Sequence, residues 1–142
     1  MNDKSAVHWS FWVIGALALV WNALGGVNYI MQMNPDIVAS FPDTQKAIIN
    51  GRPAWATGGF AVGVFGGAIG AILLLLRKPL AVYVFIASLL GILVTMIHTF
   101  QVVRSPVEFT TMEVFVMMVL PAIVAVFLVL YSKTAGQSQT AP

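Results

Sequence analysis

The chain has 142 residues, of which 59% are hydrophobic and only 8% are charged. A chain of this composition cannot enclose its apolar side chains in one water-soluble core, so the lipid bilayer must be its solvent. The formal net charge is +2 and the basic residues are scattered rather than clustered, which gives no support to nucleic-acid binding. The sequence contains no cysteine, which excludes disulfides, thiolate metal sites and cysteine nucleophiles.

Four almost uncharged stretches are each long enough to cross a hydrocarbon core of about 30 Å. They predict a single membrane domain over residues 1–142, with spans at about 9–33, 53–76, 79–103 and 110–132 and a disordered tail at 133–142. Continuous apolar runs of this length favour helices over the alternating strands of a membrane barrel. The predicted fold class is therefore all-α, an integral membrane four-helix bundle.

Two interruptions of the apolar pattern carry further structural expectations. Between the first two spans, the stretches 40–43 (Ser-Phe-Pro-Asp) and 50–51 (Asn-Gly) have the residue types that begin and end a helix. They predict a short interfacial helix between spans one and two. In the fourth span, Pro121 lacks a backbone donor and predicts a kink.

The distribution of basic residues indicates an orientation. The basic turn Arg77-Lys78 joins spans two and three, and such turns favour the cytoplasm. An even number of spans then places the N- and C-termini in the cytoplasm as well. Lys4, Arg77, Lys78 and Lys133 would lie inside, against Lys46, Arg52 and Arg104 outside. Because this balance is close, dual insertion remains an alternative.

Small residues recur at helical spacing along the second span. This stripe predicts close helix packing and consists of Gly59, Gly63, Gly66, Gly67 and Gly70. In the first span, Asn22 is placed near the bilayer centre, where an amide without a partner would cost a few kcal/mol. Two partners are considered for Asn22, an interhelical hydrogen bond or a bound substrate.

Six side chains form a hypothetical substrate-binding set, because each faces the predicted bundle interior or lies near its outer end. The set is Asn22, Asn28, Gln32, Trp55, His98 and Glu113. An ionisable residue in a span is costly and suggests a function, so His98 and Glu113 could form a proton-responsive pair. The alternative is that His98 only hydrogen-bonds across helices, while Glu113 lies among headgroups and pairs with Arg104 or water.

The sequence predicts no enzyme activity, no cofactor and no metal site. His8 and His98 are assigned to opposite membrane faces, which disfavours haem held by two histidines. The spans contain no paired aspartates and no serine placed with an obvious base. Six of the seven methionines fall in the outer halves of the spans, near His98. Thioether ligands suit Cu(I), but methionine is also an ordinary filler of helix contacts.

Several short motifs carry a family resemblance. They are Trp21-Asn22 with Gly25, the stretch 53–57 (Pro-Ala-Trp-Ala-Thr), Phe65-Gly66-Gly67, and leucines 73–76 before Arg77-Lys78. Over about residues 11–131 the chain resembles a family of small four-span bacterial inner-membrane proteins, some of which carry the label "sugar transporter". The resemblance implies the four-span fold and a bacterial inner membrane. It carries over no functional residue.

Two functions follow as hypotheses. The first is a small-solute transporter-like protein that acts as an oligomer, formed through the glycine face of the second span or the Asn22 face of the first. The alternative is a non-transporting accessory or assembly subunit, whose small-residue faces dock onto a larger membrane complex. The expected partners are therefore the lipid bilayer and either further copies of the chain or such a complex.

Overall fold

The computed structural model describes residues 9–104 and 109–140, with side chains up to residue 135. The predictions for Lys4 and His8 lie outside these residues. The described residues form helices without a strand, which confirms the all-α fold. In chain order the helices are α1 (Trp9–Gln32), α2 (Pro35–Val38), α3 (Asp43–Asn50), α4 (Ala54–Leu75), α5 (Ala81–Val103), α6 (Thr111–Val114), the π-helix η1 (Phe115–Val119) and α7 (Leu120–Thr140).

Four helical stretches are long and apolar enough to cross a membrane. They are α1, α4, α5 and the continuous stretch Thr111–Ala135, which joins α6, η1 and the first part of α7. Large apolar side chains point outward along them, among them Leu17, Leu24 and Leu130, each at least 60% exposed. Such a surface is suited to lipid rather than to water, and supports an integral, multi-pass membrane protein.

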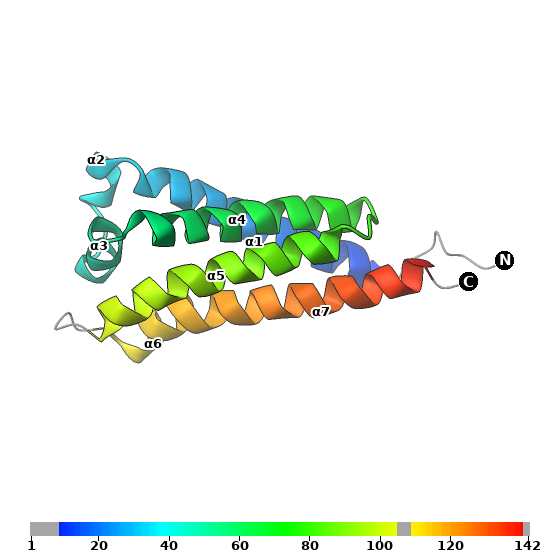
Figure 1. Ribbon diagram of the computed structural model, residues 1–142. Coiled ribbons are helices and arrows are strands. Elements are labelled where there is room, and N and C mark those ends of the chain that lie inside the picture. The colour runs from blue at the N-terminus through cyan, green and yellow to red at the C-terminus, as the bar shows by residue number, and fades with distance from the viewer. Residues whose placement is uncertain (1–8, 105–108, 141–142) are drawn as a thin grey trace.

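The long helices pack in chain order. Helix α1 lies against α4, α4 against α5, and α5 against α7. Helix α1 begins and α7 ends at the same end of the bundle, while α2, α3 and α6 lie at the opposite end (Figure 1). We refer to these as the termini end and the α3 end.

Glycines bring α4 and α5 into the closest contact of the bundle. A Cβ added to Gly91 of α5 would lie 2.5 Å from the carbonyl oxygen of Gly59 and 2.8 Å from the backbone nitrogen of Gly63. These distances are too short for any side chain, so the interface requires glycine.

The remaining glycines of the stripe also pack against other helices of the same molecule. Gly66 lies against Ser88 and Gly70 against Phe85, both of α5, whereas Gly67 leaves room for the Asn22 side chain of α1. The glycine face and the Asn22 face are therefore occupied within one molecule. A homo-oligomer would have to use other surfaces than the two considered from the sequence.

The apolar core lies toward the termini end. Its buried residues come from all four long helices and are Phe11, Ala18, Ala71, Leu74, Ala81, Phe85 and Leu128. Phe85, only 2% exposed, is the largest fully buried side chain among the described residues. This core closes the termini end of the bundle.

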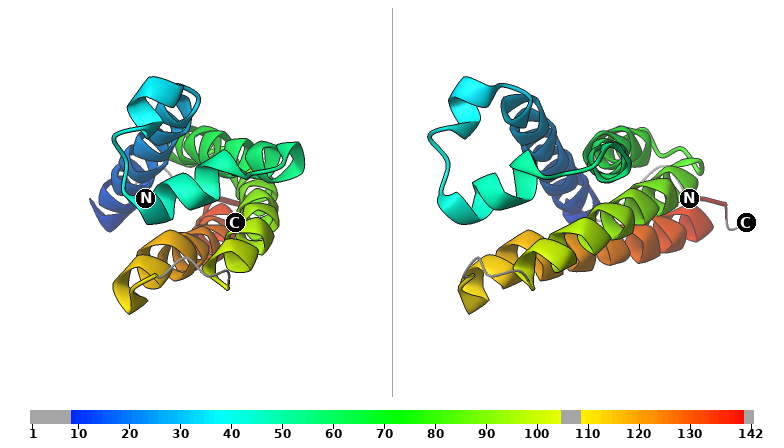
Figure 2. Two further views of the ribbon diagram at one scale, coloured as in Figure 1. Left: turned by 90° about the vertical axis from the view of Figure 1, so that its left-hand side faces the viewer. Right: turned by 60° about the vertical axis from the view of Figure 1, so that its left-hand side comes forward.

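Two short helices cover the α3 end. Asn34 caps α2, since its side chain accepts a hydrogen bond from the backbone nitrogen of Asp36 at 2.9 Å, and Pro35 occupies the first turn. Helix α3 crosses the end of the bundle (Figure 2, left) and buries Ile48 against it. The predicted short helix between spans one and two is thereby confirmed.

The last span departs from the expectations in two places. Before Pro121 the chain forms the π-helical turn η1, in which the backbone nitrogen of Leu120 donates to the carbonyl of Phe115. This turn accommodates the donor that proline lacks. Helix α7 also continues to Thr140, whereas a disordered tail was predicted from residue 133. Residues 141–142 lie outside the described ranges.

Candidate functional site

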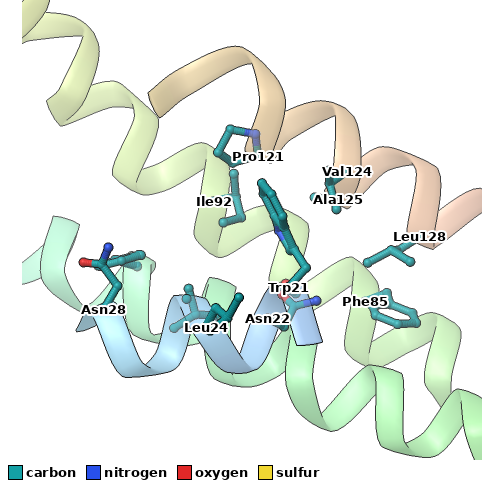
Figure 3. Close-up of a pocket in the computed structure, with 14 residues that line it drawn as sticks. Trp21, Asn22, Leu24, Asn28, Phe85, Ile92, Pro121, Val124, Ala125 and Leu128 are labelled. Atoms are coloured by element: carbon teal, nitrogen blue, oxygen red, sulfur yellow. The ribbon is translucent and has the colours of Figure 1, made fainter. Parts of the chain in front are cut away.

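A cavity separates α1 from α7 in the middle of the bundle. We call it the apolar cavity; it has a volume of about 310 Å³ and most of its lining is apolar. Its lining includes Trp21 and Leu24 of α1, Phe60 of α4, Ile92 of α5, and Pro121 and Leu128 of α7. Figure 3 shows Trp21 extending from α1 toward α7.

A second cavity lies beneath α3. We call it the polar cavity; it has a volume of about 290 Å³, and its polar lining residues are Asn28, Gln32, Gln45, Arg52, Thr95 and Thr99. It shares Asn28, Phe60 and Pro121 with the apolar cavity. Because the two share these residues, they adjoin, and we refer to the adjoining pair as the cleft, which is polar at the α3 end and apolar in the middle.

A third hollow lies between this cleft and the lipid-facing surface. We call it the lateral groove; it has a volume of about 380 Å³ and an almost wholly apolar lining from α1 and α7. Trp21, Leu24, Val124 and Leu128 line both the lateral groove and the apolar cavity. The indole of Trp21 therefore stands at the boundary between the inside of the bundle and the lipid.

Arg52 supplies a positive charge to the polar cavity. Its Nε donates a hydrogen bond to Thr57 Oγ1 at 3.2 Å, and its guanidinium lies 5.1 Å from the ring centre of Phe60. Tyr29 packs edge-on against Phe60 at 5.5 Å and holds that ring in place. Arg52 is fixed in position at the end of α3 by these neighbours.

The charge of Arg52 is not neutralised by a carboxylate within residues 9–104 and 109–140, where the salt bridge is that of Lys46 with Asp43. Partial burial lowers the pKa of Arg52 below its usual value, with an opposing effect from Tyr29. An arginine nevertheless stays protonated at neutral pH. Since the side chain has several N–H donors and one bonds Thr57, the others remain for water or a ligand.

Helix α1 contributes three amides to the cleft. Gln32 Nε2 donates to Asn28 Oδ1 at 2.6 Å, while the Oε1 of Gln32 is buried without a partner in the described part of the chain. An unpaired buried acceptor costs about 1–3 kcal/mol, which a polar occupant would relieve. Asn22 lines the apolar cavity, and its Nδ2 donates to the Ala18 carbonyl of its own helix at 2.8 Å.

His98 and Trp55 lie outside the lining of the apolar and polar cavities and fix α3 instead. His98 is 6% exposed, and its Nε2 lies 3.0 Å from the carbonyl oxygen of Ile48 in α3. Because a carbonyl only accepts, this contact requires the proton on Nε2. The Trp55 ring packs edge-on against the imidazole at 6.5 Å. The geometry is that of a cross-helix hydrogen bond.

The carboxylate of Glu113 is engaged in hydrogen bonds that stabilise the chain rather than facing the cleft. Glu113 forms a capping box with Thr110, and its carboxylate accepts a hydrogen bond from the hydroxyl of Thr44 in α3. Arg104 lies over the ring of Phe100 at 5.5 Å. Of the predicted set, Asn22, Asn28 and Gln32 therefore line the cleft. His98 and Glu113 do not contact each other, since His98 bonds Ile48 and Glu113 bonds Thr44.

Comparisons of the chain with protein-family models, with curated proteins and with solved structures found no match. The geometry of the cleft is therefore the basis for a functional proposal. Within residues 9–104 and 109–140, no three histidine, aspartate or glutamate side chains gather to hold a metal ion.

Arg52 and Phe60 are among the cleft residues that the sequence did not predict. Arg52 was counted only as a loop charge, and Phe60 belongs to an apolar span in which nothing distinguishes it. One signal was available for Arg52, since a single arginine lies between the Asn50-Gly51 helix end and Pro53, directly beside a span.

Proposed function

We propose that this protein is a transporter-like protein of the bacterial inner membrane, with both termini in the cytoplasm, and that it binds a small solute in the polar cavity. The observation that carries the proposal is the polar cavity itself, in which the positive charge of Arg52 has no carboxylate partner among the described residues and Gln32 has an unpaired acceptor. A solute-binding membrane protein needs such a set of uncommitted polar groups at the end of an apolar bundle.

The closed core at the termini end supports a transport role. The cleft ends at Phe85 and Leu128, which belong both to the apolar cavity and to the buried core. A solute that enters at the α3 end therefore meets a barrier, as it does in one state of an alternating-access protein. The π-helical turn borders the polar cavity through Val116 and Met117, and Pro121, directly after it, lines both cavities. The turn offers a place where α7 can adjust.

The proposal can be tested with the accessibility of engineered thiols, because the natural sequence has no cysteine. Thr95→Cys, in the polar cavity, should react in intact cells with a membrane-impermeant thiol reagent. Ala71→Cys is the matched control, since Ala71 is fully buried in the core. A Thr95→Cys variant as inert as Ala71→Cys, from either side of the membrane, would show that the cavity takes up no solute.

The same variants test orientation and assembly. Reaction of Thr95→Cys from the periplasm, and of Lys133→Cys only after permeabilisation, is expected for cytoplasmic termini. The mass of the protein purified in mild detergent should correspond to an oligomer of this chain. Purification with a fixed, different partner would instead favour the accessory-subunit alternative.

A further inference from the structure

The cleft has the polarity profile of a single-chain amphiphile. Its α3 end carries the guanidinium of Arg52, and its other end is lined by apolar side chains such as Ile92 and Leu128. Along α1 the cleft extends from Trp21 to Gln32, which corresponds to about 16 Å at 1.5 Å per residue. A ligand that filled it would need a charged head and an apolar tail in this order.

The positive charge of Arg52 determines which kind of head group the cleft can bind. Arg52 lines the polar cavity with amides and hydroxyls, and no aspartate or glutamate of residues 9–104 and 109–140 lines it. A guanidinium in a partly buried position binds a carboxylate or phosphate more strongly than it binds a neutral group. A cationic head would meet unfavourable charge without compensation.

The lateral groove provides a route for the tail. It is apolar, is lined by α1 and α7, and shares Trp21, Leu24, Val124 and Leu128 with the apolar cavity. Trp21 is 40% exposed, so its indole is not fixed by the core. Trp21 is the largest of the four shared side chains, and displacement of its ring would widen the passage for an acyl chain from the bilayer without taking the chain out of an apolar environment.

We propose that the cleft binds a single-chain anionic amphiphile, which enters from the membrane between α1 and α7, with its head at Arg52 and its tail in the apolar cavity. This inference rests on the proposed function and specifies the class of its solute. Arg52 acts as the head-binding residue and Trp21 as a side gate.

Binding of fatty-acid anions to the purified full-length protein in nanodiscs of neutral lipid tests the inference, with protein-free nanodiscs subtracted. The probes are acetate, octanoate, decanoate and the uncharged decanol. Expressed against the free aqueous concentration of the probe, each methylene buried in the apolar cavity should tighten binding about fourfold, so decanoate should bind about fifteenfold more tightly than octanoate. Acetate, which lacks a tail, should bind weakly.

Arg52→Gln should weaken decanoate binding about ten- to hundredfold and leave decanol within about threefold, because only the charged head uses the guanidinium. Arg52→Lys should keep the preference for decanoate over decanol, which separates a charge effect from misfolding. Arg104→Gln is the matched control, since Arg104 also lies over a phenylalanine ring but is exposed and outside the cleft. Trp21→Ala should accelerate decanoate association in stopped flow, whereas Trp12→Ala should not.

The outcomes separate this inference from the proposed function. If acetate and decanoate bind equally and both depend on Arg52, the polar cavity binds solutes but the tail assignment is wrong. If decanoate and decanol bind equally in the wild type and in Arg52→Gln, the head assignment is wrong. If no anion binds while Thr95→Cys is accessible, the amphiphile inference fails and the polar cavity remains. An inert Thr95→Cys removes the proposed function itself.

Discussion

Replacement of Gly91 by alanine should test whether the α4–α5 contact holds the bundle together. The new Cβ would lie 2.5 Å from the carbonyl oxygen of Gly59 and 2.8 Å from the backbone nitrogen of Gly63. Both atoms belong to the backbone and cannot rotate away as a side chain can. The two helices would have to separate by almost 1 Å to reach an ordinary van der Waals distance of about 3.4 Å.

The magnitude follows from two opposing effects. Overpacking of a tight core costs about 1–3 kcal/mol, and the backbone contact places Gly91→Ala toward the upper end of this range. Alanine also favours the helix by up to about 1 kcal/mol over glycine. The free energy of unfolding should therefore fall by about 1–2 kcal/mol. Gly58→Ala, where a Cβ meets nothing within 4 Å, should be neutral or stabilising.

Reversible unfolding in mixed micelles, followed by circular dichroism, measures both variants under one condition. The expected difference between them is about 1–3 kcal/mol. Differences below about 0.5 kcal/mol are within the usual error of additivity. If the free energies of unfolding of Gly91→Ala and Gly58→Ala differ by less than this, the close approach of α4 and α5 is wrong.

Three further substitutions probe the elements around the cleft. His98→Ala leaves the Ile48 carbonyl without its partner and should raise hydrogen exchange across α3, at a cost of about 1–3 kcal/mol; unchanged exchange in 43–50 would contradict the contact. Thr44→Val removes the hydroxyl that donates to Glu113 and should raise exchange in both α3 and α6, whereas Thr134→Val, on the exposed end of α7, should not. Pro121→Ala restores a backbone donor and should stabilise the last span by up to about 3 kcal/mol in the same micelle titration, and a loss of stability would contradict the account of η1.

The four spans and the buried faces were accessible from the sequence because lipid imposes a simple rule. Apolar runs of span length must be helical, and helical periodicity then separates small and polar residues from large apolar ones. Ser88, Gly91 and His98 fall on one face for this reason, and the structure buries all three.

The partners of individual polar groups could not be predicted in the same way. His98 bonds a backbone carbonyl of α3, and Asn22 bonds a carbonyl of its own helix, and neither acceptor has a side-chain signature in the sequence. The π-helical turn before Pro121 is one of several ways in which a helix can absorb a missing donor. The position of Arg52 depends on how α3 folds back over the bundle, which is a tertiary property.

The packing of each long helix on its predecessor has a consequence for synthesis. A nascent chain that has reached Arg104 already contains α1, α4 and α5, and so both partners of the tightest interface, before the last span leaves the ribosome. Contacts between elements close in the chain form quickly and need no long-range search. The boundary between the first and last helices is completed last, and it is the one part of the bundle whose closure has to wait for the whole polypeptide.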